Sequence, residues 1–314
     1  MTAERRHLRC VVFARRDLGY WCLAEILAQR DEVLAVFARE NDPGENLWFR
    51  GVADLARAHG VPTFAPRDPN APEWAAKVRA LAPEMIFSLD YGTPLGAEIR
   101  AAATLGALDV HGSLLPDLRG GDPVNWALVE GRDRTGATLA YAADEEDAGD
   151  VVDRQAVAID FEETAFTLGQ KIAAAAREIM ERTLPRLREG TAPRAPQDLA
   201  AGCLRRRREA ADGLIDWTRP ALAVYNLVRA TTHPFPGAFT FAGGRKLFVW
   251  AAHPVAGEGG GAAPGTIVAR DERGLAAVVA TGDGLLRLET IQFAGETERP
   301  GGALAAGDVL GEGA

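Results

Sequence analysis

The sequence predicts an α/β protein in which an open, mostly parallel, Rossmann-like sheet is followed by a small β-rich domain of the OB-like type. Three observations support this fold class. Short apolar runs alternate with helical patterns over residues 1–190, as in a parallel sheet with right-handed crossovers. Gly and Pro interrupt the pattern at 191–202, which indicates a linker. Over 203–314 the pattern becomes mainly short strands broken by Gly-rich turns.

The elements of the first domain follow from the spacing of apolar residues, which is two along a half-buried strand and near 3.6 along a helix. The expected strands are 8–14, 32–38, 62–64, 84–89, 107–111, 137–142 and 151–159. The expected helices are 20–29, 51–59, 72–81, 95–103, 124–130 and 164–188. Residues 14–19, after the first strand, lack the Gly-x-Gly-x-x-Gly pattern, which argues against a dinucleotide site of the usual kind.

The second domain begins near a run of four arginines, 205–208, and continues with one helix and five strands. The helix is expected at 221–230, and the strands at 238–241, 246–251, 265–269, 275–280 and 285–293. Five short strands in so short a stretch suit a small OB-like barrel. The arginine run leaves two interpretations open, a solvated charged face or contact with phosphate groups.

Composition limits the function classes. The chain has 314 residues, of which 47% are hydrophobic and 25% charged, as is typical of a globular protein with a sizeable core. Its formal net charge of -9 makes broad nucleic-acid binding a poor default. No apolar run approaches the ~18 to 20 residues that span a bilayer, and the start lacks the apolar core of a signal peptide. We therefore expect a cytoplasmic protein with no membrane partner.

The three cysteines are Cys10, Cys22 and Cys203. They are odd in number and lack the spacing of a metal site. Buried, reduced thiols are the usual state of such cysteines in a cytoplasmic protein. We expect no metal site in the chain.

The candidate site centres on the strand at 107–111 and the loop after it. This strand ends at His111, where Gly, Ser and Pro follow, and open α/β sheets place their chemistry at such strand ends. Asp109 lies two residues before His111, so both side chains point to the same side of the strand. Asp147 follows the next strand, in an acidic loop. The imidazole and the two carboxyls can act together as base, orienting group and charge stabiliser.

Several motifs together resemble the folate-dependent formyltransferase family, and the resemblance covers essentially the whole chain. They are His-Gly-Ser-Leu-Leu-Pro at 111–116, Arg-Gly at 119–120 and Asp-Ala-Gly-Asp at 147–150. Within the family, the chain is most similar to sugar-nucleotide N-formyltransferases and to the formyltransferase part of the bifunctional enzyme acting on UDP-4-amino-4-deoxy-L-arabinose. The motifs that carry this closer resemblance are at 41–45, 87–88, 125–128 and 233–239.

The resemblance implies transfer of a formyl group from 10-formyltetrahydrofolate to an amine. The family uses an Asn, a His and an Asp to stabilise a tetrahedral oxyanion and to move protons. The His corresponds to His111, which can transfer protons near neutral pH, and the Asp to Asp147, which would orient His111 and favour its charged form. The Asn corresponds to Asp109, and at this position the sequence departs from the family.

The departure at Asp109 leaves three alternatives open. An amide donates a hydrogen bond to a developing oxyanion, whereas a carboxylate repels it, and losing such a donor costs other enzymes about 10²- to 10³-fold in rate. In the first alternative Asp109 is protonated in the site and donates as an acid. In the second it supports an altered acyl-transfer or hydrolase reaction. In the third the protein binds its ligands without transfer.

The resemblance also implies which residues bind the ligands. The family holds the pteridine largely through backbone groups at the strand end beside the catalytic His and in the loop that leads to the catalytic Asp. The corresponding candidates for folate binding are Leu89, Asp90, Tyr91, Ala143, Asp144, Glu145 and Glu146. The candidates for lining the acceptor site are Ser113, Leu114, Leu115, Arg119 and Asn125.

Three functions remain open on the sequence alone. The leading one is N-formylation of a small molecule, an amino sugar carried on a nucleotide. Methionyl-tRNA is the alternative acceptor, and the acidic net charge disfavours it. A protein that keeps the fold for binding only is the third. A homodimer also stays open.

Overall fold

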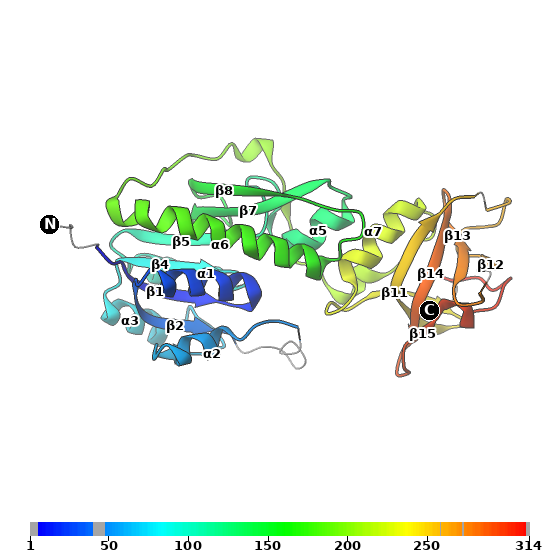
Figure 1. Cartoon of the computed structure of the whole chain (residues 1–314), viewed down its shortest axis with the longest axis horizontal. Helices are drawn as coiled ribbons and strands as arrows, with labels where there is room; N and C mark the ends of the chain where they lie inside the picture. The colour runs from blue at the N-terminus through cyan, green and yellow to red at the C-terminus, as the bar shows by residue number, and fades with distance from the viewer. Residues whose placement is uncertain (1–5, 40–47, 258, 272, 312–314) are drawn as a thin grey trace. The chain divides into compact units, whose positions relative to one another are not determined.

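The computed structural model describes residues 6–39, 48–257, 259–271 and 273–311. The motif at 41–45 lies outside these residues. The described residues form two compact units (Figure 1). The first unit consists of the described residues within Met1–Pro123, Arg134–Ile159 and Leu168–Arg206. The second consists of those within Val124–Asp133, Asp160–Thr167 and Arg207–Ala314. The domain boundaries at 190 and 203 stay a prediction.

The first unit is built on a seven-stranded sheet with the order β3-β2-β1-β4-β5-β7-β8. Its strands are β1 (Arg9–Ala14), β2 (Glu32–Ala38), β3 (Thr63–Phe64), β4 (Met85–Leu89), β5 (Gly106–His111), β7 (Arg134–Tyr141) and β8 (Val151–Ala158). The pairs from β3 to β5 are parallel, whereas β7 is antiparallel to both β5 and β8. The mostly parallel sheet is therefore confirmed.

The helices of this part of the chain match the expected ones within one residue at each end, with two exceptions: the first helix begins at Arg16 rather than at 20, about one turn earlier than expected, and the helix expected over 95–103 is much shorter. They are α1 (Arg16–Ala28), α2 (Val52–Ala58), α3 (Pro72–Leu81), α4 (Ala97–Arg100), α5 (Pro123–Val129) and α6 (Ala165–Glu189). The expectation of a helix over 95–103 was wrong in length, because α4 is a single turn that buries only Ile99. One buried side chain gives a longer helix little packing to stabilise it.

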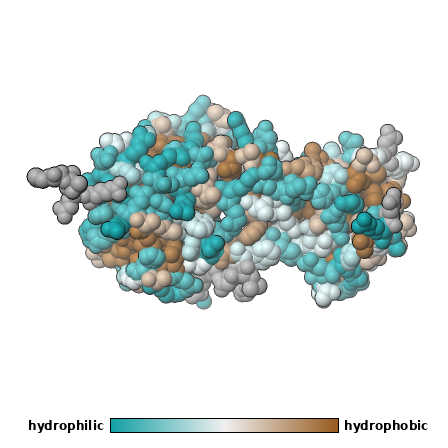
Figure 2. All heavy atoms as spheres, viewed as in Figure 1, coloured by the Kyte–Doolittle hydropathy of each residue, from teal (hydrophilic) through white to brown (hydrophobic). Residues whose placement is uncertain are grey.

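Helices cover both faces of the first sheet. Helices α1 and α6 lie side by side on one face (Figure 1), joined by ion pairs such as Arg177–Glu25. On the other face, α3 and α4 pack on alternate side chains of β1, including Val11 and Phe13. Burying both faces explains why β1, β2 and β4 are nearly all apolar. The outward side of α6 is polar, and Figure 2 shows hydrophilic residues over much of this surface.

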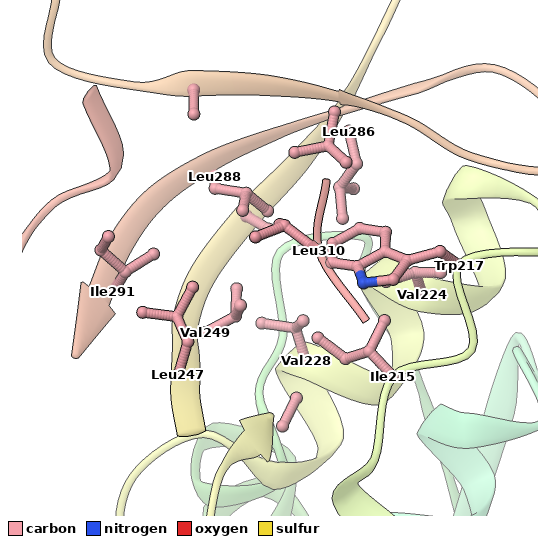
Figure 3. Close-up of a cluster of buried hydrophobic side chains, with 14 of the residues drawn as sticks. Ile215, Trp217, Val224, Val228, Leu247, Val249, Leu286, Leu288, Ile291 and Leu310 are labelled. Atoms are coloured by element: carbon pink, nitrogen blue, oxygen red, sulfur yellow. The ribbon is translucent and has the colours of Figure 1, made fainter. Parts of the chain in front are cut away.

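The second unit is built on an antiparallel sheet with the path β10-β11-β14-β13-β12, to which β15 adds beside β14. Its strands are β10 (Ala238–Ala242), β11 (Arg245–Val255), β12 (Ile267–Arg270), β13 (Ala277–Ala280), β14 (Leu285–Phe293) and β15 (Arg299–Pro300). Helix α7 (Ala221–Thr231) packs on it through Val224 and Val228, which meet Trp217 and Leu288 in one apolar core (Figure 3). The antiparallel sheet is confirmed, and its OB-like classification stays a prediction.

A third, two-stranded sheet had no counterpart in the sequence expectation. Strand β6 (Arg119–Gly120) pairs in parallel with β9 (Leu204–Arg205). Short 3-10 helices complete the described chain at Leu199–Ala201, Ala210–Gly213 and Gly301–Ala303. Two-residue strands bury too little to leave a periodic pattern, so periodicity alone could not have found them. In the described part of the chain, every helix is too short or too polar to cross a bilayer.

Candidate functional site

The candidate site lies where β4 and β5 end together. Ser88 of β4 is in register with Asp109 of β5, and Leu89 with Val110. Because alternate residues of a strand share a face, Asp109 and His111 project from the same side of the sheet. Open α/β sheets bind ligands at this carboxyl edge. The expectation that Leu89 lies at a strand end beside the strand of His111 is confirmed.

Both ring nitrogens of His111 face oxygen atoms. Nε2 lies 2.8 Å from the carbonyl oxygen of Leu118, and Nδ1 lies 3.5 Å from Oδ2 of Asp147. A carbonyl oxygen only accepts, so Nε2 carries a hydrogen. Nδ1 then faces a carboxyl group, and their approach is favourable only with a proton between them. The imidazole and this carboxyl are 9% and 7% exposed, so water screens the pair weakly.

Asp147 is held by the backbone around it, in the turn between β7 and β8. The backbone N–H of Gly120 donates to its Oδ2 at 2.7 Å, the same oxygen that faces His111. Asp147 has a left-handed backbone with φ of 54°, which non-glycine residues adopt at a cost. Gly149 follows, and a Cβ there would lie 1.7 Å from the carbonyl oxygen of Tyr141, so only glycine fits. The structure thus brings His111 and Asp147 together.

Asp109 is half-buried and hydrogen-bonds to the hydroxyl of Ser88. Burial and, after it, the charge of Asp147 raise the pKa of its carboxyl to about 7, while His111 and the Ser88 hydroxyl oppose the shift. A substantial fraction of Asp109 is therefore protonated at neutral pH. This supports the first of the three alternatives, in which the carboxyl donates a hydrogen bond.

The residues expected to bind folate fall into two groups. Leu89 and Tyr91 are buried, and between them Asp90 has a left-handed backbone, with φ of 54°, and an exposed side chain. Although the residue reaches solvent, protein atoms crowd its carboxyl and raise its pKa, against the lowering charges of Arg16 and Arg15. The second group, 143–146, is an exposed turn.

Two ion pairs fix the exposed turn at 143–146. Asp144 pairs with Arg100, and Oε1 of Glu145 accepts a hydrogen bond from Arg119 at 2.6 Å. Arg119 is buried, with only 9% of its side chain exposed. The sequence made Arg119 a candidate for lining the acceptor site, and the structure gives its guanidinium a carboxylate partner, Glu145. The two arginines pin the side chains of the turn and leave its backbone at the surface.

The other acceptor-site candidates in the loop after β5 are mostly engaged with their own loop. The Ser113 hydroxyl donates to the carbonyl oxygen of Asp117 at 2.5 Å. Thr138 of β7 donates to the carbonyl oxygen of Ser113 and accepts from the backbone N–H of Leu115. Leu115 is buried and Leu114 is half-buried. These contacts fix the loop that carries the carbonyl of Leu118 to His111.

Asn125 is placed elsewhere. It belongs to the second unit, where it is buried and its amide donates to the carbonyl oxygen of Ala230 at 2.6 Å. This hydrogen bond gives Asn125 a structural task at the end of α7. The role of Asn125 toward an acceptor stays a prediction.

Sequence reasoning missed three residues that contact the site. Ser88 hydrogen-bonds to Asp109, Gln197 hydrogen-bonds to the Asp147 turn, and Cys203 lies beside the carbonyl-bearing loop at Leu118. Ser88 could have been found from the register of two adjacent parallel strands. No sequence signal marks the other two: Gln197 lies in the segment expected to be a linker, and Cys203 begins the expected second domain. Over the residues that the structure covers, no group of three or more His, Cys, Asp and Glu side chains is arranged to hold a metal ion.

Two family models match the chain. Residues 20–184 match the model described as formyl transferase, and residues 208–308 match the model for the C-terminal domain of formyl transferase. The first match contains His111, Asp109 and Asp147, and the second contains the antiparallel sheet.

Solved structures resemble the chain in fold. HypX from Aquifex aeolicus is 20% identical with a TM-score of 0.64, over 95% of this chain and 47% of that one. The chain thus spans about half the length of HypX. An N-formyltransferase from Helicobacter canadensis is 15% identical with a TM-score of 0.68, over 90% and 99% of the two chains. WlaRD, a sugar 3N-formyl transferase, is 14% identical with a TM-score of 0.68, over 94% and 100%.

Proposed function

The chain belongs to the formyl transferase family, and we propose that it transfers a formyl group from 10-formyltetrahydrofolate to the amine of a nucleotide-linked amino sugar. The observation that carries this proposal is the placement of His111 between the Leu118 carbonyl and the Asp147 carboxyl, with Asp109 on the same side of the sheet. Such a site can move a proton and stabilise an oxyanion within one cluster of side chains.

His111 is the proton-transfer group in this proposal. Its Nε2–H is held by a carbonyl that cannot take the proton, so Nδ1, facing Asp147, is the nitrogen with a variable proton. An amine that attacks an acyl carbon must lose a proton. The Asp147 carboxylate, beside the imidazole that holds the proton between them, can accept it, and the pair can return a proton to the folate nitrogen as the bond from that nitrogen to the formyl carbon breaks. The hydrogen bond from Gly120 keeps Asp147 oriented while the proton moves.

Asp109 is the donor to the developing oxyanion. With a pKa raised to about 7 by burial, the carboxyl keeps a proton at or below neutral pH and donates it in a hydrogen bond, as the family's amide does. Ser88 fixes the carboxyl from the neighbouring strand. Above this pKa the carboxylate would repel the oxyanion, so this role ties activity to pH.

The formyl donor supplies an activated one-carbon group, and two segments fit its flat heterocycle. The turn at 143–146 exposes its backbone while Arg100 and Arg119 pin its side chains. The carboxyl of Asp90, whose pKa is raised by burial, lies just after the end of β4 and can exchange hydrogen bonds with ring nitrogens. We assign the folate to Leu89, Asp90 and Tyr91 together with this turn.

The acceptor class is supported by similar proteins. The Helicobacter canadensis N-formyltransferase was solved with folinic acid and dTDP-3-aminofucose, and WlaRD with dTDP and 5-N-formyl-THF. HypX was solved with tetrahydrofolic acid. The net charge of -9 favours a small nucleotide over tRNA as the anionic partner.

The test is an acceptor panel. The protein is incubated with 10-formyltetrahydrofolate and several nucleotide-linked amino sugars, with methionyl-tRNA alongside. Tetrahydrofolate release is followed optically, and the formylated product is identified by mass spectrometry. We expect release that depends on an amino sugar and is nearly insensitive to salt. Release only with tRNA, falling steeply with salt, would replace the acceptor, and release with water alone would indicate a hydrolase.

A further inference from the structure

The segment at 195–205, which we call the strap, runs along the candidate site rather than away from it. Ala195 exchanges two backbone hydrogen bonds with Val151, at 2.7 and 2.9 Å. At its other end, β9 pairs with β6 next to the loop that follows His111. The strap thus contacts both sides of the site within the first unit.

Gln197 is the strap's contact with the Asp147 turn. Its amide nitrogen donates to the carbonyl oxygens of Asp147 and Gly149, at 2.8 and 2.6 Å. The side-chain oxygen of Gln197 is buried and has no hydrogen-bond partner in the described part of the chain. A flipped amide would set that oxygen against two carbonyls, so the orientation of the amide is determined. One amide group therefore closes the turn on either side of Ala148.

The Asp147 turn needs such support. Asp147 has a φ of 54°, and a left-handed backbone is unfavourable for a non-glycine residue. Strained backbone persists only where surrounding contacts determine it. The two hydrogen bonds from Gln197 are contacts of this kind, and they act on the residue whose carboxyl faces His111.

The other partner of His111 is held by the same strap. The carbonyl of Leu118 accepts the hydrogen bond from His111, and the N–H of Leu118 lies 3.4 Å from the Sγ of Cys203. The next residue, Arg119, donates its N–H to the carbonyl oxygen of Cys203 at 2.9 Å. The strap is thus linked to the backbone that supplies each oxygen facing the imidazole.

We propose that Gln197 is a positioning residue, which sets the carboxyl of Asp147 against Nδ1 of His111 and so fixes the proton between them. This inference rests on the proposed function for its kinetic consequence. It makes the strap a part of the site, although Gln197 lies 50 positions from Asp147 along the chain.

The test compares Gln197→Met, which keeps the side-chain length and removes the amide, with Gln29→Met as a matched control. Gln29 also donates to a backbone carbonyl of the first unit, that of Glu181, at 2.9 Å, and has no contact with the site. We expect Gln197→Met to lower kcat by about 10- to 100-fold, as small misplacements of reacting groups do, with KM within about threefold. The control should keep both constants.

A spectroscopic readout separates positioning from general weakening. The ¹⁵N shifts of the His111 ring nitrogens report which nitrogen carries a proton, and His111→Asn identifies their signals. At pH 7 we expect Nδ1 to move toward the shift of an unprotonated nitrogen in Gln197→Met and to stay unchanged in Gln29→Met. This measurement needs neither donor nor acceptor, so it decides the role of Gln197 even if the proposed function fails.

Two results would overturn the inference. One is a Gln197→Met protein with wild-type shifts at His111, whatever its activity. The other applies if the wild-type protein is active: a Gln197→Met protein whose His111 shifts are altered but whose kcat equals that of the wild type. Should Gln197→Met not fold, Gln197→Asn, which withdraws the amide by one methylene, is judged on the same two readouts.

Discussion

Two buried ion pairs of the first unit differ in geometry. Arg188 of α6 meets Asp31 through two hydrogen bonds, at 2.8 and 2.7 Å, and the N–H of Leu8 donates to the same carboxylate. His111 and Asp147 are separated by 3.5 Å. The first pair is only 5% and 0% exposed, and the second 9% and 7%. The two pairs are almost equally buried, so they differ in the number and length of the hydrogen bonds that hold them.

The contrast separates a structural pair from a chemical one. A bidentate Arg–carboxylate pair holds fixed charges, because the guanidinium does not release its proton. An imidazole, unlike a guanidinium, can transfer a proton to or from a reacting group. We therefore expect the Arg188 pair to govern stability and the His111 pair to govern turnover.

The largest expected effect is on the chemical pair. His111→Asn keeps a polar side chain that cannot transfer a proton, so we expect single-turnover tetrahydrofolate release to fall about 10³-fold. The free energy of unfolding should fall by about 1 to 3 kcal/mol, because the buried Leu118 carbonyl and Asp147 carboxyl lose a hydrogen-bond partner. Release within tenfold of wild type would remove His111 from the chemistry.

The structural pair is tested by Arg188→Met, which leaves the carboxylate of Asp31 buried without its partner. We expect a loss of about 3 to 5 kcal/mol in the free energy of unfolding, measured by denaturant titration. Arg182→Met is the matched control on the same helix, since its pair with Asp153 is 41% and 24% exposed and should contribute under about 1 kcal/mol. Equal losses for the two variants would contradict the assignment.

Asp109→Asn tests how the raised pKa of this carboxyl makes the free energy of unfolding depend on pH. The pKa of Asp109 is raised by burial to about 7, whereas an unfolded Asp titrates near 3.9. Between these values the folded protein holds a proton that the unfolded chain has lost, so this group lowers stability as pH rises toward 7. We expect Asp109→Asn to raise the free energy of unfolding above pH 7, by about 4 kcal/mol at most, and to change it little below pH 4.

The same variant tests the role of Asp109 in the rate. If its protonated form is the donor, wild-type release should fall as pH rises through about 7, and Asp109→Asn should remove that fall and raise the rate at high pH. The pH–rate profiles of the two proteins provide the check. Loss of turnover in Asp109→Asn at every pH would give Asp109 a chemical task of its own.

The smallest expected effect concerns an exposed partner. Glu145 is 63% exposed and pairs with the buried Arg119 at 2.6 Å. Because solvent screens such a pair, Glu145→Gln should change the free energy of unfolding by less than about 1 kcal/mol. We expect KM for the folate donor to change by about threefold or less, measured by steady-state kinetics. A tenfold rise would show that Glu145 contacts the donor.

Most of the fold could be predicted from periodicity. The seven strands of the first sheet and the long helix α6 are buried on regular faces, and such patterns are visible in one sequence. The one-turn helix Ala97–Arg100 and the paired strands Arg119–Gly120 and Leu204–Arg205 were missed or misjudged. Elements this short are fixed by tertiary contacts, which a local pattern does not contain.

The site was predictable where its residues are close in sequence. The two-residue spacing of Asp109 and His111 placed them on one face, and the acidic loop supplied Asp147. The roles of Leu118 and Gln197 were not predictable. Leu118 contributes its backbone carbonyl, and the Gln197 side chain donates to a backbone carbonyl, and residue identity does not specify the backbone conformation that either contact needs. Periodicity also does not indicate contacts between residues 50 positions apart, such as Gln197 and Asp147.

The most direct measurement pairs Asp147→Asn with Asp31→Asn, each assayed for tetrahydrofolate release and for the free energy of unfolding. We expect Asp147→Asn to lose about 10³-fold or more in release while its stability changes by no more than about 1 kcal/mol. Asp31→Asn should lose several kcal/mol of stability while its folded molecules retain release within about threefold. Release that survives in Asp147→Asn, or that fails in folded Asp31→Asn, would contradict the division between the two pairs.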